Sequence, residues 1–501
     1  MVNGTHIGTG TGTGTGAGTG LDMSGLSSYP FPEDEGRRGR KFPGIDAVTV
    51  LSLLVVALVL IPSRYVVGPL GGSGTPANLI AVLAFIWYCA SMSTERSTPL
   101  KGRQPIRTSI LIYVCAILAS YIGAMNRPIS GEEMQAANMA LLPVIGWCGI
   151  ALLAADGITT KDRLDKLIRR FVIGATFVGI VGIIQFATAF DLSQYLAFPG
   201  LKVNGTFISL YNRDGFNRPT STTIHPIEFS ATLAMALPLA IHNLLYGRAG
   251  RRWVKRVCVA VLATAVPLTV SRTAVLGMAV CFIVLMPTWP RAWRHTAYVA
   301  LLMFTGAMSV AVPGLLGTFK RMFFGMGDDS SATARTDDYA AVARYFSEHP
   351  LFGRGVGTFL PHTYRILDNQ YLATLVETGA FGLGAVLLIF LSGWVVARRS
   401  RRKSDDPETR HLGQALAASI AVFAVTCGTF DAFSFPVAVS VAFLLIGCAG
   451  ALWRITDPHG GAYVAVSPRW IRLFMGRGSA QDMVVHPVAS PRSPEGAGRR
   501  R

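Results

Sequence analysis

The sequence predicts an all-α, multi-pass membrane protein of about twelve transmembrane helices with one large extracytoplasmic loop. Hydrophobic residues make up 51% of the 501 residues, and only 15% are charged. The apolar residues come in blocks of about 20, the length that crosses a bilayer core as a helix. A net charge of +18 would suggest nucleic acid in a soluble chain. Here the basic residues gather between apolar blocks, as the positive-inside rule requires, so no nucleic-acid partner is expected.

Twelve apolar segments qualify as spans by length. They cover residues 46–66, 77–93, 108–125, 136–155, 171–190, 224–245, 256–270, 273–289, 295–315, 372–397, 411–429 and 433–453. With the N-terminus inside, most Lys and Arg residues fall in the inner segments, so both termini are predicted to be cytoplasmic and the location is the plasma (inner) membrane. Pro267 and Ser271-Arg272 interrupt the run 256–289, which we interpret as two helices with an outer tip. One kinked span is the alternative.

The two ends of the chain differ in composition from the membrane domain, which we place at residues 45–455. Residues 1–44 begin with Thr-Gly repeats and end near a basic cluster, a composition that cannot bury a core. They are predicted to be a disordered cytoplasmic leader, because no cleavage site follows the first apolar block. Residues 456–501, rich in Arg, Pro, Gly and Ser, are predicted to be a basic cytoplasmic tail that contacts membrane lipids.

The largest polar segment, residues 313–371, is predicted to be an outer loop that carries a site, since loops of this length are uncommon unless they are functional or disordered. An apolar stripe at helical spacing predicts a short amphipathic helix within it, capped by Thr336. The stripe consists of Tyr339, Val342, Ala343 and Phe346. Beyond this helix, Gly353, Gly355 and Gly357 allow a tight backbone.

Arginines on the outer side run against the positive-inside bias, and a guanidinium in hydrocarbon costs about 2.5–3.5 kcal/mol on insertion scales. An anionic ligand would offset that cost. Arg272 lies at the predicted tip, and Arg218 and Arg335 lie in outer segments. A converging set of planar, bidentate arginines suits a pyrophosphate better than a sugar or an inorganic cation.

Metal and cofactor signals are missing from the predicted outer segments. HxxxH, HxH and Asp-Xaa-Asp patterns do not occur there, and the loop Gly353–Gly357 lacks the Lys and the strand-to-helix context of a phosphate loop. The seven cysteines stand singly in apolar runs and are interpreted as packing residues. The sequence therefore predicts neither a metal nor a cofactor.

Three stretches in and after the outer loop carry a family resemblance by their joint spacing. They are His349-Pro350-Leu351-Phe352-Gly353-Arg354-Gly355-Val356-Gly357-Thr358-Phe359, Asp368-Asn369-Gln370-Tyr371-Leu372 and Val376-Glu377-Thr378-Gly379-Ala380-Phe381-Gly382-Leu383. With Arg218 to Pro226, Ser271-Arg272 and Arg335 in the same order, the chain resembles the O-antigen ligase and Wzy-type polymerase family. The resemblance covers about residues 45–455.

The resemblance implies a GT-C-like, metal-independent glycosyltransferase of cell-surface polysaccharide assembly. Such an enzyme takes a glycan from an undecaprenyl-pyrophosphate carrier on the outer leaflet and joins it to a hydroxyl of a glycan, lipid or cell-wall acceptor. Arginines matching Arg218, Arg272 and Arg335 would hold the pyrophosphate. Arg354, in the stretch from His349 to Phe359 that we call the signature loop, is a fourth candidate. Many ligases of the family have His where this chain has Asp368.

Displacement at an anomeric carbon needs a stabilised leaving group and a base near the acceptor hydroxyl. Asp368 is the first candidate for that base, although it could also cap the helix 372–397. His362 is the second, and Glu377, which could equally brace the same helix, is the third. A lipid-linked oligosaccharide flippase or another transporter is the alternative function, since it too would need a basic cavity. The lack of repeated halves favours the enzyme.

Overall fold

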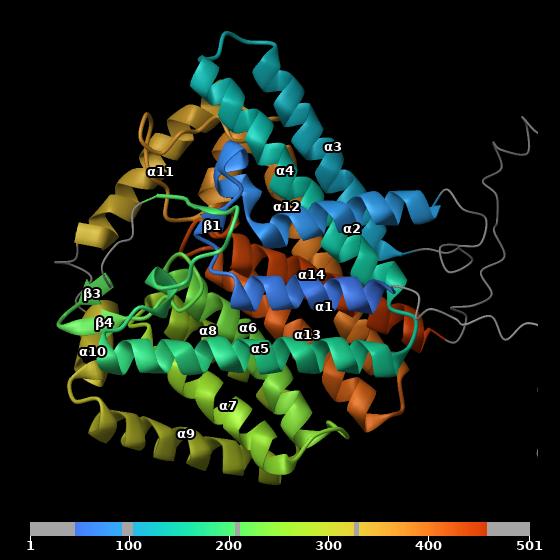
Figure 1. Ribbon diagram of the computed structural model, residues 1–501, viewed down its shortest axis with the longest axis vertical. Coiled ribbons are helices and arrows are strands. Elements are labelled where there is room, and N and C mark those ends of the chain that lie inside the picture. Colours follow the sequence, from blue (N-terminus) through green and yellow to red (C-terminus); the bar gives the residue numbers. More distant parts are fainter. Residues whose placement is uncertain (1–45, 93–103, 206–210, 325–329, 458–501) are drawn as a thin grey trace, which may run out of the picture. The chain divides into compact units, whose positions relative to one another are not determined.

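A computed structural model describes the chain from Asp46 to Asp457 with three gaps (Figure 1). The described residues are 46–92, 104–205, 211–324 and 330–457, and the side chains of residues 330–337 are not described. All of them belong to one compact unit, Asp46–Arg501. The predicted leader 1–44 and nearly all of the tail 456–501 lie outside the described residues.

The regular secondary structure of the described part is helical apart from two pairs of short strands. The helices are α1 Ala47–Leu60, α2 Pro76–Met92, α3 Pro105–Met125, α4 Gly131–Gly157, α5 Lys161–Thr188, α6 Pro226–Leu245, α7 Arg252–Leu268, α8 Arg272–Leu285, α9 Arg291–Ala311, α10 Leu315–Phe324, α11 Ser330–Glu348, α12 Gln370–Lys403, α13 Pro407–Thr426 and α14 Pro436–Thr456. Short 3₁₀ helices are η1 Gly68–Gly74, η3 Leu192–Gln194, η4 Met286–Thr288 and η6 Ala432–Ser434. Strand β1 Tyr65–Val66 pairs with β2 Lys202–Val203, and β3 Tyr211–Arg213 pairs with β4 Phe216–Arg218, both antiparallel.

Every range predicted as a span contains a helix, but not every helix is long enough to cross a membrane alone. Within the described ranges, six helices are long and apolar enough, and two bent pairs bring the number to eight. The pairs are η1 with α2, bent by 80°, and α9 with α10, bent by 109°. Helix α1 and the stretch α8–η4 are shorter apolar helices. The chain is therefore a multi-pass membrane protein, and the number of twelve spans stays a prediction.

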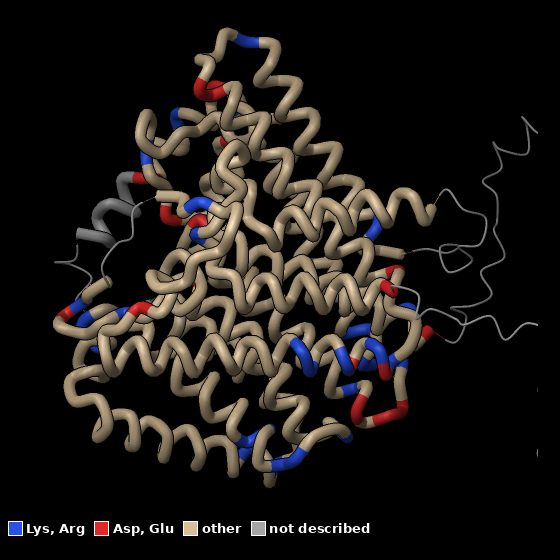
Figure 2. The backbone as a smooth tube through the Cα atoms, in the orientation of Figure 1, with Lys and Arg blue, Asp and Glu red and all other residues tan. Residues whose placement is uncertain are grey.

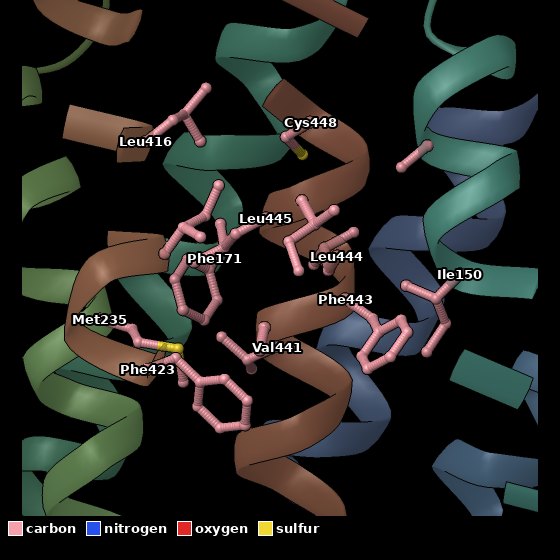
Figure 3. Packing of buried hydrophobic residues seen from close by; sticks show 14 of the residues in the cluster. Ile150, Phe171, Met235, Leu416, Phe423, Val441, Phe443, Leu444, Leu445 and Cys448 are labelled. Carbon is pink, nitrogen blue, oxygen red and sulfur yellow. The ribbon is translucent and has the colours of Figure 1, made fainter. Parts of the chain in front are cut away.

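Helix α14 forms the centre of the packing. It contacts α4, α12, α13 and α6, and nearly all of its residues are buried. Phe443 and Leu444 of α14 lie among Ile150 and Phe423 from other helices (Figure 3). Close approach depends on small residues, since a Cβ on Gly447 would lie 2.6 Å from the Ala151 carbonyl oxygen.

Charged residues gather at the helix ends, and the middle of α1 and α5 carries none (Figure 2). This distribution leaves the apolar surface of the helices for lipid, because a charge at the bilayer centre is costly.

The run from Arg252 to Leu285 forms two helices, as predicted. Residues 269–271 separate α7 from α8. Arg248, just before α7, pairs with Glu408 at 3.0 Å, and the Trp289 indole N–H donates to His411 Nε2 at 3.0 Å. Glu408 and His411 both lie in the first turns of α13. The residues before α7 and those after α8 therefore lie at the same end of the helices, and the chain reverses between α7 and α8. The division into two helices is confirmed, and the single kinked span is wrong.

The segment predicted as one large outer loop contains helices α10 and α11. Helix α11 begins at Ser330, so the cap predicted at Thr336 is wrong. Val342 is buried together with Phe359, whereas Tyr339 is 60% exposed. Only part of the predicted apolar stripe therefore forms the buried face of α11, which packs against α12.

Candidate functional site

A β-hairpin carries Arg218 to the turn between α7 and α8. Its two-residue turn, Asp214-Gly215, has φ of +49° and +83°, the left-handed pair of a type I′ turn. Asp-Gly between two short strands is a strong hairpin signal in a sequence, so this turn was predictable. Arg218, at the end of β4, is 9% exposed, and its Nε donates to the Thr269 carbonyl at 3.0 Å.

The guanidinium of Arg218 retains an unused donor. Its Nη2 is buried and has no hydrogen-bond partner among the described residues. Burial, and then the neighbouring Arg213, lower the pKa of Arg218 to about 10, so the side chain is still a cation at neutral pH. A buried cation with an unsatisfied donor is costly unless a ligand accepts from it. Arg218 is therefore a candidate anion-binding group.

The turn that Arg218 contacts leads into α8 at Arg272. Val270 has a left-handed φ of +47°, and Ser271 is the N-cap residue. The first N–H groups of α8 and the positive end of its dipole follow directly, and both favour an anion. The structure thus brings Arg218 to the start of the helix that Arg272 begins, and pyrophosphate binding by these two residues stays a prediction. Arg335 lies on α11, and its side chain is outside the described residues.

Arg64 joins this basic region and was not predicted. It is 6% exposed, and its Nη2 donates to the Ile224 carbonyl at 3.4 Å. The charges of both Arg64 and Arg218 act on the ring of His225, so both guanidiniums lie in its neighbourhood. Arg64 could have been identified from the sequence, because it lies at the outer end of the first predicted span, where the positive-inside rule disfavours Arg.

Glu228 is a buried residue in the same region, and backbone N–H groups donate to both oxygens of its carboxylate. Its Oε1 accepts from the Val437 N–H at 2.7 Å and the Ala438 N–H at 3.4 Å, and its Oε2 accepts from the Ile224 N–H at 2.9 Å. These bonds join the starts of α6 and α14. Glu228 is therefore a structural cap shared by two helices.

The signature loop packs directly on a broken turn of α12. The Arg354 N–H donates to the Val376 carbonyl at 2.8 Å, and Gly379 interrupts the helix with a φ of +67°. Gly353 has a φ of +70°, and a Cβ there would lie 2.4 Å from the Glu377 carbonyl oxygen. The backbone of the loop lies directly against the backbone of α12 at this contact, which confirms the predicted tight backbone. This contact requires Gly353, so the glycine needs no phosphate ligand to explain it.

We expect Gly353→Ala to destabilise the protein strongly. The strained φ alone costs about 1–3 kcal/mol, and the overlap with the Glu377 carbonyl adds to it. Gly384→Ala is the matched control, because Gly384 lies in the same helix α12 as the partner backbone with nothing within 4 Å of its Cβ position. Thermal unfolding in detergent should show a lower midpoint for Gly353→Ala and an unchanged or higher one for Gly384→Ala. Equal midpoints for the two variants would contradict the packing described.

Arg354 is held inside a polar cluster instead of facing an open site. Its Nη2 donates to Glu133 Oε1 at 3.1 Å and to the Tyr364 hydroxyl, and its guanidinium lies 4.3 Å from the centre of the Tyr364 ring. Tyr364 donates to the same Glu133 oxygen at 2.8 Å, and Arg127 Nε donates to the Arg354 carbonyl at 3.1 Å. The cluster ties the α3–α4 turn to the signature loop. This geometry favours a structural role for Arg354, and pyrophosphate binding by it stays a prediction.

A double-mutant cycle should reveal that role. Arg354→Gln removes the guanidinium that donates to the buried Glu133 carboxylate and leaves only Arg127, at 4.0 Å, as its charged partner among the described residues. We expect this change to cost about 1.5–3 kcal/mol of stability. Glu133→Gln should cost a similar amount. The double variant should lose clearly less than the sum, with a coupling of at least about 0.5 kcal/mol. Additive losses in the unfolding measurements would mean that the pair does not act as a unit.

Asp368, the first candidate base, is exposed and does not cap α12. Asn369 is the cap, since its Oδ1 accepts from the Tyr371 N–H at 2.9 Å and the Leu372 N–H at 3.3 Å. The predicted capping role of Asp368 is therefore wrong. Its carboxylate acts instead on Asp431, which lies between α13 and α14.

Asp431 is a candidate catalytic group that the sequence did not reveal. Burial, together with repulsion from Asp368, raises the pKa of Asp431 to about 6, although the Ser434 hydroxyl opposes the shift. A carboxyl group with a pKa near neutrality is suited to general-base chemistry. Helices α12 and α13 separate Asp431 from Asp368 along the chain. The two carboxylates come close enough to interact because the α13–α14 turn packs against the start of α12, which the sequence does not show.

A cavity of about 240 Å³ lies beside Asp431 and the start of α12. Aromatic side chains and polar groups share its wall, among them Tyr113, Trp147, Phe359, Phe433, Gln370, Arg365 and Asp431. A second cavity, of about 390 Å³, has Trp147, Phe433 and Ser434 in common with it. Aromatic faces combined with a few placed hydrogen-bonding groups are typical of pockets for organic ligands. The two adjoining cavities offer room for sugar units next to a carboxylate.

The other two candidate bases have defined partners. Glu377 lines the smaller cavity, but the N–H groups of Gly357 and Phe359 donate to its carboxylate, which favours the bracing role. His362 Nε2 lies 2.9 Å from Glu132 Oε1, and both side chains are more than half exposed. His362 lines neither cavity.

A metal site was not predicted, and no group of three His, Cys, Asp or Glu side chains that could hold an ion occurs in the part of the chain with described positions. The metal independence of any reaction stays a prediction.

The fold and these sites define a multi-pass membrane protein with a basic region at one turn and an aromatic cavity beside a carboxylate pair. Residues 257–387 match the family model Wzy_C, whose description is O-Antigen ligase. The match confirms the predicted resemblance over this segment, which includes Arg272, Arg335, Arg354 and Asp368. Arg218 and Asp431 lie outside it. No curated protein matches the chain.

Proposed function

We propose that the chain is a membrane glycosyltransferase that moves a glycan from an undecaprenyl-pyrophosphate carrier to an acceptor hydroxyl on the outer face of the membrane. Membership of the segment 257–387 in the O-antigen ligase family supports a role as a ligase or polymerase of polysaccharide assembly. The observation that carries the proposal is Arg218, a buried cation with an unpartnered Nη2 at the turn where α8 begins.

In the proposed reaction, Arg218, Arg272 and Arg335 bind the pyrophosphate of the donor. The acceptor oxygen attacks the anomeric carbon, the bond from that carbon to the phosphate oxygen breaks, and its electron pair leaves with the pyrophosphate. Fixed guanidiniums stabilise the negative charge that develops there. The Asp431 carboxylate takes the proton of the acceptor hydroxyl, and Asp368 tunes the pKa of Asp431. Asp431 replaces Asp368 as the favoured base because it lines the cavity and Asp368 does not.

Glycan profiling of a deletion strain tests this function in cells. A polymerase would leave short glycans, and a ligase would leave full-length polymer on its lipid carrier. A flippase or transporter, the alternative from the sequence, would instead trap the lipid-linked glycan on the inner leaflet. Unchanged surface glycans would contradict the proposal.

We also propose the topology on which this reaction depends, with both termini cytoplasmic and the signature loop outside. In a Cys89→Ser, Cys115→Ser background, which removes the two exposed cysteines, Thr363→Cys should react with an impermeant maleimide added to intact cells. Ser404→Cys, at the opposite end of α12, should react only after the membrane is opened. The reverse pattern would place the proposed site on the wrong face.

A further inference from the structure

A third cavity lies at the end of the helices opposite to Arg218. It has a volume of about 340 Å³ and is formed by the first turns of α5, the last turns of α6, the first turns of α7 and the start of α13. The sequence predicts this end to be cytoplasmic. Figure 2 shows basic residues gathered at this end of α5. None of the residues proposed for glycan transfer lines it.

Most of the acidic side chains of this cavity form ion pairs or hydrogen bonds with neighbouring residues. Lys161 Nζ lies 2.9 Å from Asp165 Oδ2 and 2.8 Å from Glu408 Oε1, and Arg248 Nε lies 3.0 Å from Glu408 Oε2. Asp406 accepts from the Thr409 N–H at 2.9 Å as the cap of α13. Each of these carboxylates has a defined structural partner.

The remaining bases are not neutralised. Lys166, Arg169 and Arg251 line the cavity, and none of them forms an ion pair within the ranges that the structure describes. Lys255 also lines it and donates to the Gly247 carbonyl. Counting Asp162, four acids and six Lys or Arg residues line the cavity, so positive charge is in excess. Guanidinium and ammonium groups together favour a phosphate.

Part of the cavity wall is apolar, and this part continues onto the surface of α5. Val172, Ile173, Val254 and Cys258 line the cavity. From Ile173, a stripe of exposed apolar side chains runs along the same face of α5. It consists of Ile173 (52% exposed), Phe177 (45%), Ile180 (40%) and Ile184 (51%). At 1.5 Å per residue, this stripe extends about 16 Å toward the opposite end of the helix.

We propose that this cavity binds the phosphate headgroup of an anionic phospholipid whose acyl chain lies along the stripe from Ile173 to Ile184. Lys166 and Arg169 fall on the face of α5 that continues into the stripe, so charge and apolar surface are aligned as headgroup and chain are in a lipid. A free inorganic or nucleotide phosphate would use the bases and leave the stripe without a role. Basic pockets between helices at a membrane surface bind anionic lipid headgroups by the same physics.

The test compares lipid binding by the purified full-length protein and its variants. Native mass spectrometry in detergent, with added phosphatidylglycerol or phosphatidylcholine, should show one retained phosphatidylglycerol on the wild type. Lys166→Gln with Arg169→Gln should weaken it by about fivefold for each charge removed. Arg170→Gln is the matched control, since Arg170 lies on the same helix but donates to Ser52 Oγ and does not line the cavity. It should retain the lipid, as should Lys166→Arg with Arg169→Lys.

Three outcomes would overturn the proposal. Equal retention of phosphatidylcholine would show that charge does not select the ligand. An equal loss in Arg170→Gln would show that the lipid binds elsewhere on α5. Thermal unfolding of the wild type is a second measurement, and it does not depend on whether a variant folds. The wild-type midpoint should rise with phosphatidylglycerol vesicles and not with inorganic phosphate, and an equal rise with phosphate would assign the cavity to a soluble anion.

Discussion

Arg218→Ala is expected to lower glycan transfer by about 10²–10³-fold, the effect of removing one fixed donor from a site that stabilises a developing anion. The reason is geometric. Nε of Arg218 donates to the Thr269 carbonyl, and this hydrogen bond fixes the guanidinium at the start of α8. Nη2 remains to donate to the ligand. Turnover with a synthetic undecaprenyl-pyrophosphate-linked glycan is the measurement.

Two further variants separate charge from folding. Arg218→Gln keeps an amide donor for Thr269 but lacks the charge, so it should fold and remain nearly inactive. Arg218→Lys keeps the charge but lacks the planar fork, so it should rescue poorly. Arg213→Ala, on the paired strand, removes a nearby cation that does not contact Thr269 and should stay close to wild type. Wild-type turnover in Arg218→Gln would eliminate Arg218 from pyrophosphate binding.

The second large effect is expected at Asp431. As a general base it must be ionised, and its pKa is raised to about 6 by burial and by Asp368. Transfer should therefore be full above this pH and fall as the pH drops through about 6. Asp431→Asn should lower turnover by about 10²-fold or more at every pH, because the amide cannot accept the proton.

Asp368→Asn should behave differently. It removes a negative neighbour, so the pKa of Asp431 should fall somewhat below about 6. Burial is the larger cause of the raised pKa and remains in this variant, so the pKa should stay above the ordinary Asp value and the acid limb of the pH profile should move only slightly to lower pH. Turnover near neutral pH should change little. If Asp368→Asn is inactive at every pH while Asp431→Asn is active, the base is Asp368, as the sequence alone predicted.

The helices and the signature loop were predictable because their causes are local. Apolar blocks of bilayer length and the break at Pro267 and Ser271-Arg272 are visible in the chain. So are the three glycines of the loop after α11. The structure adds why they are needed, since Gly353 faces the carbonyl of Glu377 at the kink of α12.

The partners of the charged side chains were not predictable, since packing brings together residues far apart in the sequence. Glu133 and Arg354 form one cluster, and Asp368 and Asp431 interact across the start of α12. At the start of α12, Asp and Asn are both good caps, so sequence could not decide which of the neighbours Asp368 and Asn369 fills that role. The hydrogen bonds of Asn369 decide it.

Cleavage of the bond between a glycan and its pyrophosphate carrier is the step that defines the proposed function. The most direct measurement uses purified protein, a synthetic undecaprenyl-pyrophosphate-linked glycan and an acceptor with a free hydroxyl, with EDTA present throughout. We expect free undecaprenyl pyrophosphate and elongated acceptor in equal amounts from the wild type, and little of either from Arg218→Gln. Intact donor, moved across a liposome bilayer without cleavage, would contradict the account and identify a transporter.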